Sequence, residues 1–195
     1  MKLDILLVGV GGQGILTTSN ILARAALKAG VNVVTAETHG MAQRGGSVEV
    51  HVRLGDVYAP LIPVGGADYA ISLEPVEILR YTQYLNENTT VILNDRPIVP
   101  PSVSAGLGKY PEISEILETL RGITKNVKLV SASKIAEEVA GTIQATNVVV
   151  VGMLAKLADL PFDYEVLEEV VKEFFPEKLV EPNLKALKAG YNYWG

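Results

Sequence analysis

Cysteine is absent from this 195-residue sequence, and histidine occurs only at His39 and His51. Without cysteine, the chain has no disulfides, no thiol nucleophile and no thiolate ligands for iron–sulfur clusters or structural zinc. The two histidines do not form a metal-binding spacing such as HExxH. We therefore expect no metal site on this chain, and we expect any electron transfer to take place on another chain.

Long apolar runs and basic clusters are also lacking. No segment approaches the roughly 18 apolar residues that a membrane-spanning helix needs, and Asp4 interrupts the stretch where a signal peptide would be apolar. The net charge is -5, and no group of lysines and arginines could follow a phosphate backbone. These absences predict a soluble cytoplasmic protein that binds neither membranes nor nucleic acid.

What is present is an apolar content of 48%, enough for one sizeable core in a single domain spanning residues 1–195. A strand over 3–10, a helix over 15–29 and a strand over 31–36 form a β-α-β unit, which implies a parallel pair with a right-handed crossover. Over 48–54, valines and leucine alternate with polar residues. This alternation is typical of a strand with one solvent-facing side, on which His51 would be solvated.

The rest of the chain continues the alternation of strands and helices. The valine run at 147–151 suits a buried strand or a helix, and we favour the helix because the segment continues without a turn signal. Asp163 stands at an N-cap position, with Phe162 and Leu167 placed as a hydrophobic staple. The expected strands cover 67–73, 89–95 and 127–133, and the expected helices cover 74–86, 133–140 and 146–159. A further helix follows Asp163, and a last helix starts at Pro182. The proline-rich residues 96–111 are expected to form an irregular excursion or a short hairpin.

This order of elements predicts a three-layer α/β fold with a mostly parallel, Rossmann-like sheet and a C-terminal helical extension over about 161–195. The first turn, "GVGGQG", places Gly9, Gly11 and Gly14 in GxGxxG spacing between the first strand and the first helix. Free N–H groups at such a helix start bind phosphate, although a glycine turn also allows close packing of strand against helix. Glu37 lies where a dinucleotide-binding protein holds its ribose, which leaves an NAD(P)-dependent dehydrogenase as an alternative.

A second glycine segment, "AETHGMAQRGGSVEVHVRLG", follows the second strand. Parallel strands end at one edge of a sheet, so this loop is expected beside the first glycine turn. Arg44 carries a guanidinium suited to phosphate or carboxylate, with a surface salt bridge as its other interpretation. Gly45 and Gly46 would allow a close approach to a ligand or a partner chain. For His39, a structural hydrogen bond and a chemical role both stay open, since the sequence shows no acid or nucleophile paired with it.

Both glycine segments, together with the C-terminal "LPFDYEVLEEVVKEFFPEKLVEPNLKALKAGY", resemble the gamma-type domain of 2-oxoacid:ferredoxin oxidoreductases. Within this family, "HGMAQRGGSV" is most similar to the beta subunit of indolepyruvate:ferredoxin oxidoreductase. The resemblance covers nearly the whole chain. It implies oxidative decarboxylation of an aryl 2-oxoacid to an acyl-CoA, with reduction of ferredoxin.

The resemblance further implies that this chain is a non-redox subunit, inactive alone and without catalytic residues. Thiamine diphosphate, Mg and the iron–sulfur clusters would lie on a larger alpha subunit, and the sequence lacks the GDG...NN pattern that binds thiamine diphosphate. CoA contact on this chain is a hypothesis, and a non-catalytic scaffold is the alternative. An anion-facing turn would be formed by Gly9, Gly11, Gly12, Gln13 and Gly14, and the adjoining wall toward the alpha subunit by Arg44, Gly45, Gly46 and Ser47.

Overall fold

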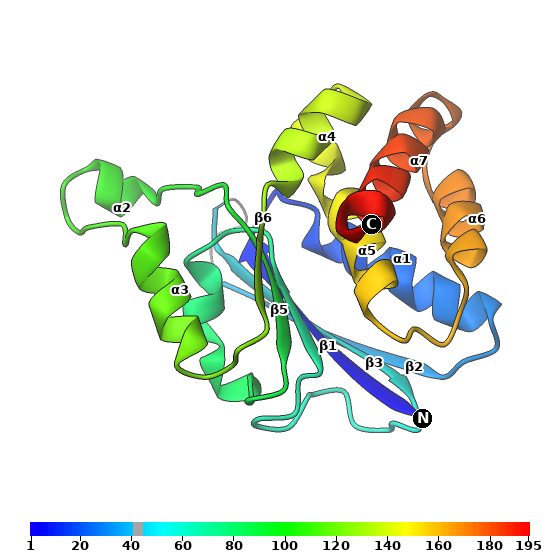
Figure 1. The fold of residues 1–195 in the computed structure, drawn as a ribbon, viewed down its shortest axis with the longest axis horizontal. Helices are drawn as coiled ribbons and strands as arrows, with labels where there is room; N and C mark the ends of the chain where they lie inside the picture. Colours follow the sequence, from blue (N-terminus) through cyan, green and yellow to red (C-terminus); the bar gives the residue numbers. More distant parts are fainter. Residues whose placement is uncertain (41–44) are drawn as a thin grey trace.

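The computed structural model describes residues 1–40 and 45–195, which contain one six-stranded sheet between two layers of helices and loops (Figure 1). The strand order is β2-β3-β1-β4-β5-β6. The strands are β1 (Lys2–Val10), β2 (Val33–His39), β3 (Ser47–Gly55), β4 (Tyr69–Ser72), β5 (Thr90–Asn94) and β6 (Val127–Val130). The predicted α/β architecture is confirmed, and the three later strands lie where the sequence placed them.

The pairing of the first two strands differs from the prediction. β3 lies between β1 and β2 and is antiparallel to both, so that β1 and β2 run in the same direction without touching. β1, β4, β5 and β6 form the three parallel pairs of the sheet. The predicted parallel direction of β1 and β2 is confirmed, but the prediction that they pair directly is wrong. β3 forms a hairpin with β2 and lies between the two strands.

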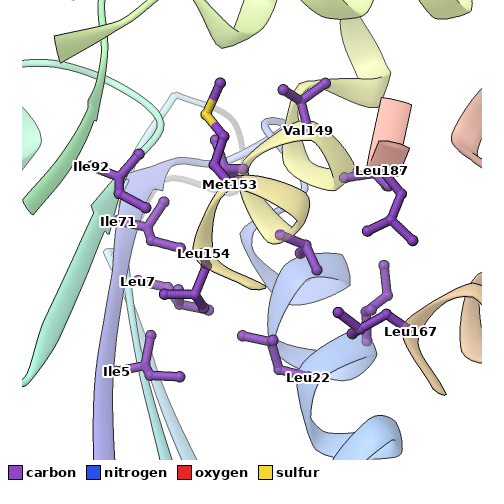
Figure 2. Close-up of a cluster of buried hydrophobic side chains, with 14 of the residues drawn as sticks. Ile5, Leu7, Leu22, Ile71, Ile92, Val149, Met153, Leu154, Leu167 and Leu187 are labelled. Carbon is purple, nitrogen blue, oxygen red and sulfur yellow. The ribbon is translucent and has the colours of Figure 1, made fainter. Parts of the chain in front are cut away.

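One face of the sheet is covered by five helices: α1 (Ile15–Lys28), α4 (Ala132–Ala140), α5 (Thr146–Leu157), α6 (Tyr164–Phe174) and α7 (Glu177–Tyr191). Figure 2 shows the core between them, where Ile5, Leu7 and Ile71 of the sheet face Leu22, Met153, Leu154 and Leu167 of the helices. Nine successive residues of α5, from Thr146 to Leu154, are buried. The helix interpretation of the valine run is confirmed, and burial on all sides explains why it has no amphipathic period.

α5 and α7 pack closely against each other through two glycines. A Cβ at Gly152 of α5 would collide with the Leu187 carbonyl, and one at Gly190 of α7 would collide with the Val149 carbonyl. α7 begins at Glu177, so the predicted start at Pro182 is wrong, and Pro182 lies inside the helix. Asp163 is the N-cap residue of α6 as predicted, although its side chain makes no capping hydrogen bond.

The other face of the sheet is covered by segment 56–66, two 3-10 turns and α3 (Ile113–Arg121). The predicted helix over 74–86 is wrong. The chain instead forms short 3-10 turns at Glu77–Arg80 and Thr82–Tyr84, and the Glu74 carboxylate accepts the N–H groups of Val76 and Glu77 at the start of this segment. The excursion over 96–111 is largely irregular as predicted and contains only the short helix α2 (Pro101–Ser104).

The polar side of β3 is buried, contrary to the expectation for His51. Its side chain is 1% exposed; Nε2 donates to Glu49 Oε1 (2.7 Å), and Nδ1 accepts the Ile62 N–H (3.0 Å). Arg53 forms an ion pair with the fully buried Asp4 at 2.7 Å and donates to the Leu61 carbonyl. Segment 56–66 therefore covers this side of the strand and supplies main-chain partners to its charged groups. No helix in the described ranges is long and apolar enough to cross a membrane.

Candidate functional site

The first glycine turn connects the central strand β1 to α1. Gly12 and Gly14 have φ values of 100° and 79°, a region that favours glycine. Gln13 fixes the turn, because its Oε1 accepts the Val10 N–H (2.9 Å) and its Nε2 donates to the Leu73 carbonyl of the β4 end (3.0 Å). The Gln13 amide therefore makes two hydrogen bonds within the chain that fix the turn.

Two of the fingerprint glycines are required by internal packing. A Cβ at Gly9 would lie 2.7 Å from Gln13 Oε1 and 2.8 Å from Ile15 Cδ1. A Cβ at Gly14 would collide with the Asn147 side chain of α5. At Gly12 a Cβ would meet nothing within 4 Å, so only its backbone conformation calls for glycine. The spacing of these glycines alone does not establish a ligand site.

The second glycine segment lies directly against this turn, as the sequence predicts. Gly11 N–H donates to the Gly46 carbonyl (2.9 Å), and Gly45 N–H lies 3.4 Å from the Gly11 carbonyl. These bonds extend the β1–β3 ladder by one residue pair beyond Val10 and Ser47. Arg44, the side chain that the sequence favours most for anion binding, lies outside the described residues.

Ser47, the last of the predicted wall residues, opens β3 and contacts a tyrosine. Its Oγ lies 2.6 Å from the Tyr81 hydroxyl, which comes from the second 3-10 turn region. Burial raises the pKa of the Tyr81 hydroxyl, and the hydrogen bond with Ser47 opposes this shift only in part. The pair therefore stays protonated at neutral pH and joins the wall to the second face of the sheet.

A cavity of about 600 Å³ opens beside the turn. The lining residues are Val10, Gly11, Gly12, Gly14, Ile15, Leu16, His39, Gly40 and Val48. In the described part of the chain, no side chain caps the start of α1. Counting from the start of the helix, Thr18 is the first residue whose backbone N–H has an acceptor there. Unpaired N–H groups and the positive end of the helix dipole therefore lie at a cavity large enough for part of a nucleotide.

Among the described residues that line this cavity, His39 is the one with an ionisable side chain. Its Nε2 lies 3.6 Å from Glu37 Oε2, and both side chains are about half exposed, at 49% and 51%. Alternate residues of a strand point to the same side, so the sequence "ETH" indicates that Glu37 and His39 lie side by side. We did not predict this pair from the sequence. The Glu37 carboxylate therefore lies within reach of the imidazole that lines the cavity.

Glu37 does not occupy the position that a dinucleotide-binding unit would give it. It lines a separate groove of about 310 Å³ between α1 and β2, together with Ser19 and Asn20. Because β3 separates β2 from β1, Glu37 lies one strand further from the glycine turn than in a unit with adjacent strands. Among residues 1–40 and 45–195, no group of three or more His, Asp or Glu side chains could hold a metal ion.

Comparison with known proteins adds evidence that the geometry alone does not supply. The family model described as pyruvate ferredoxin/flavodoxin oxidoreductase matches residues 4–193. A protein of Archaeoglobus fulgidus named indolepyruvate oxidoreductase subunit IorB is 65% identical over 192 residues, which cover 98% of this chain and 95% of the relative. A Thermococcus kodakarensis protein named pyruvate/ketoisovalerate oxidoreductases common subunit gamma is 31% identical, with 94% and 92% covered.

Solved structures share the fold at lower identity. The gamma subunit of a keto/oxoacid ferredoxin oxidoreductase from Geobacter sulfurreducens has a TM-score of 0.71 and 23% identity, with 97% of this chain and 96% of that chain covered. A 2-oxoglutarate:ferredoxin oxidoreductase from Magnetococcus marinus, solved with 2-oxoglutarate, coenzyme A and succinyl-CoA, has a TM-score of 0.72 and 22% identity. That match covers 97% of this chain and 30% of the longer chain, so the same fold also occurs as one part of a larger polypeptide.

Proposed function

This chain belongs to the pyruvate ferredoxin/flavodoxin oxidoreductase family, and from that premise we propose that it is the non-redox subunit of an indolepyruvate:ferredoxin oxidoreductase. Its relatives are named as subunits of 2-oxoacid oxidoreductases, so the chain is part of such an enzyme complex. The preference for indolepyruvate rests on the name of the 65% identical relative. A cytoplasmic location stays a prediction from the sequence.

The proposed division of labour places thiamine diphosphate, Mg and the iron–sulfur clusters on a larger alpha subunit. There the thiamine would supply the carbanion chemistry of decarboxylation, and the clusters would pass electrons to ferredoxin. The absence of cysteine from this chain agrees with that arrangement. The part left to this chain is to bind and orient the acyl acceptor and to complete the assembly.

For the acceptor, we propose that the cavity beside the glycine turn holds a phosphate of CoA. The observation that supports this most directly is the uncapped start of α1, whose N–H groups lie at a 600 Å³ cavity beside the Gly45–Gly46 wall. Glu37 lines the neighbouring groove, and its carboxylate lies 3.6 Å from the His39 imidazole that lines this cavity. The imidazole would donate a hydrogen bond to the same anion.

The two alternatives from the sequence make different demands on the structure. A free-standing NAD(P)-dependent dehydrogenase needs an acid beside the turn for the ribose, and the insertion of β3 moves Glu37 away from it. A non-catalytic scaffold needs the same partner but no acceptor site. The uncapped helix start favours the acceptor role over the scaffold.

Steady-state kinetics of the reconstituted complex tests the proposal. Arg44→Ala is expected to raise the KM for CoA about tenfold or more, the effect of losing one charge-assisted hydrogen bond, and to leave the KM for the 2-oxoacid unchanged. Arg121→Ala, at the exposed C-terminal end of α3, is the matched control and should behave as wild type. Viologen reduction with indolepyruvate, pyruvate and 2-oxoglutarate would show the substrate preference.

Three results would contradict separate parts of this proposal. Full activity of the partner without this chain would remove its role as a required subunit. An unchanged KM for CoA in Arg44→Ala, combined with weaker assembly, would favour the scaffold. Turnover of NADH by the isolated chain would favour the dehydrogenase.

A further inference from the structure

One buried carboxylate holds both ends of the excursion 96–111, which we call the arm. Glu74 is fully buried, and its Oε1 accepts the Ile98 N–H (3.1 Å) near the start of the arm and the Tyr110 hydroxyl (2.5 Å) near its end. Its Oε2 accepts the N–H groups of Val76 and Glu77 at 2.8 and 3.1 Å. Burial and the bond to Glu74 raise the pKa of Tyr110, so its hydroxyl stays a donor. The arm is therefore fixed at its base.

The arm exposes apolar side chains. Ile98 and Val99 are 42% and 45% exposed, and Leu107 is 83% exposed. In Figure 1 the arm, which contains α2, extends away from the sheet on the side opposite the α4–α7 layer. Single exposed apolar residues are ordinary, but a rigid segment that presents several of them has little conformational entropy to lose when a partner binds.

A small pocket lies between the base of the arm and the glycine turn. Its volume is about 140 Å³, and its lining residues are Gly12, Gln13, Leu73, Arg96, Ile98, Ser133, Ile143, Gln144 and Thr146. Ligand pockets usually have about 300–1,000 Å³, so this one suits a single side chain better than a nucleotide. Arg96 is already paired with Glu137 at 3.2 Å, which leaves Ile98 and Ile143 as the apolar rim.

We infer that the arm and this pocket form the docking surface for the larger partner subunit, which inserts one apolar side chain into the pocket. The inference rests on the proposed function, because a partner that carries the reacting groups must reach the cavity at the glycine turn. Gly12 lines both that cavity and the pocket, so the two are neighbours at the glycine turn. A buried apolar anchor surrounded by less critical contacts is the usual composition of a binding hot spot.

Segment 56–66 also exposes apolar side chains, but it lies far from the glycine turn. Segment 56–66 exposes Tyr58 (91%) and Val64 (79%), and it is anchored by Arg53 and His51. It follows Gly55, which pairs with Lys2 at the start of β1, so it lies at the opposite edge from the glycine turn. A partner that covers the turn has no need to cover this segment, which makes Val64 a matched control.

Partner affinity measured with the immobilised partner subunit tests the inference. The double variant Val99→Asp/Ile143→Asp is expected to bind about tenfold or more weakly, because each charge would be buried at the contact. Val64→Asp is expected to bind within about twofold of wild type. Thermal melting of each isolated variant confirms that the chain folds, since all three positions are at least partly exposed. Wild-type affinity of the folded double variant, or an equal loss in Val64→Asp, would overturn the inference.

Two further measurements separate the remaining possibilities. Sedimentation of the chain alone shows whether two copies associate through this surface, and a double variant that abolishes self-association but keeps its partner affinity would overturn the inference. Affinity is measured without CoA or 2-oxoacid. A loss of partner binding in the double variant therefore supports the docking surface even if the KM for CoA in Arg44→Ala shows the proposed acceptor site to be wrong.

Discussion

Replacing Gly14 by alanine separates the packing role of the turn from its ligand role. Gly14 has a left-handed conformation, its carbonyl accepts a bond from Asn147 Nδ2 (3.3 Å), and its missing Cβ leaves the space that Asn147 occupies. The substitution therefore imposes both backbone strain and a collision with α5. Gly30, at the other end of α1, has a φ of 73° and no neighbour within 4 Å of a Cβ, so Gly30→Ala imposes strain alone.

The expected magnitudes follow from these two situations. Left-handed backbone costs an alanine about 1–2 kcal/mol, and this is the expected loss of unfolding free energy for Gly30→Ala. Overpacking adds about 1–3 kcal/mol, which brings Gly14→Ala to about 2–5 kcal/mol. Asn147 Oδ1 has no hydrogen-bond partner in the described structure, so truncating this side chain forfeits little beyond the bond to Gly14. Asn147→Ala is expected to restore at least about 1 kcal/mol in the Gly14→Ala background.

Urea unfolding of the isolated chain, followed by circular dichroism, measures the unfolding free energy of four variants on one scale. The variants are Gly14→Ala, Gly30→Ala, Asn147→Ala and the double variant Gly14→Ala/Asn147→Ala. A non-additive gain in the double variant would assign Gly14 to helix packing. Equal losses in Gly14→Ala and Gly30→Ala, with no coupling to Asn147, would refute the collision and return Gly14 to the list of residues kept for a ligand.

Three other changes probe contacts elsewhere in the fold. Gly190→Ala would drive a methyl group into an α5 carbonyl and is expected to lower the unfolding free energy by about 3 kcal/mol or more. The loss would appear as a lower midpoint in urea unfolding, and an unchanged midpoint would contradict the close crossing of α5 and α7. His51→Phe leaves the Glu49 carboxylate buried without its donor, so a loss of about 3 kcal/mol in unfolding free energy is expected, whereas a wild-type value would mean that water reaches this site. Tyr110→Phe removes one of the two donors to Glu74 Oε1 and is expected to hasten proteolytic cleavage of the arm with a stability loss of about 1–2 kcal/mol; wild-type cleavage rates would show that the arm is held by other contacts.

The sequence predicted the strand–turn–helix opening, the α/β class and the later strands because each depends on local apolar periodicity. It did not predict the insertion of β3 between β1 and β2, since strand pairing depends on contacts far apart in the chain. The alternation in β3 identified a strand correctly. What covers its polar side is decided by segment 56–66, which has no local signal for that role.

The candidate site likewise combines features that the sequence predicts with features that depend on distant contacts. The meeting of the two glycine segments was predictable, because strands that run in one direction end at one edge. The internal role of Gln13 was not, since it depends on the Leu73 carbonyl of a strand 60 residues away along the chain. The segment expected to be a helix over 74–86 forms two short 3-10 turns, and the buried Glu74 at its start bonds to Ile98 and Tyr110, partners further along the chain that give no local signal.

The contact between the two glycine segments is made by main-chain atoms, with Gly11 bonded to both Gly45 and Gly46. An alanine at Gly45, where φ is 72°, would report backbone strain and say little about which groups recognise a ligand. Replacing the Val10–Gly11 peptide bond by an ester would instead remove the Gly11 N–H that donates to the Gly46 carbonyl and leave the shape intact.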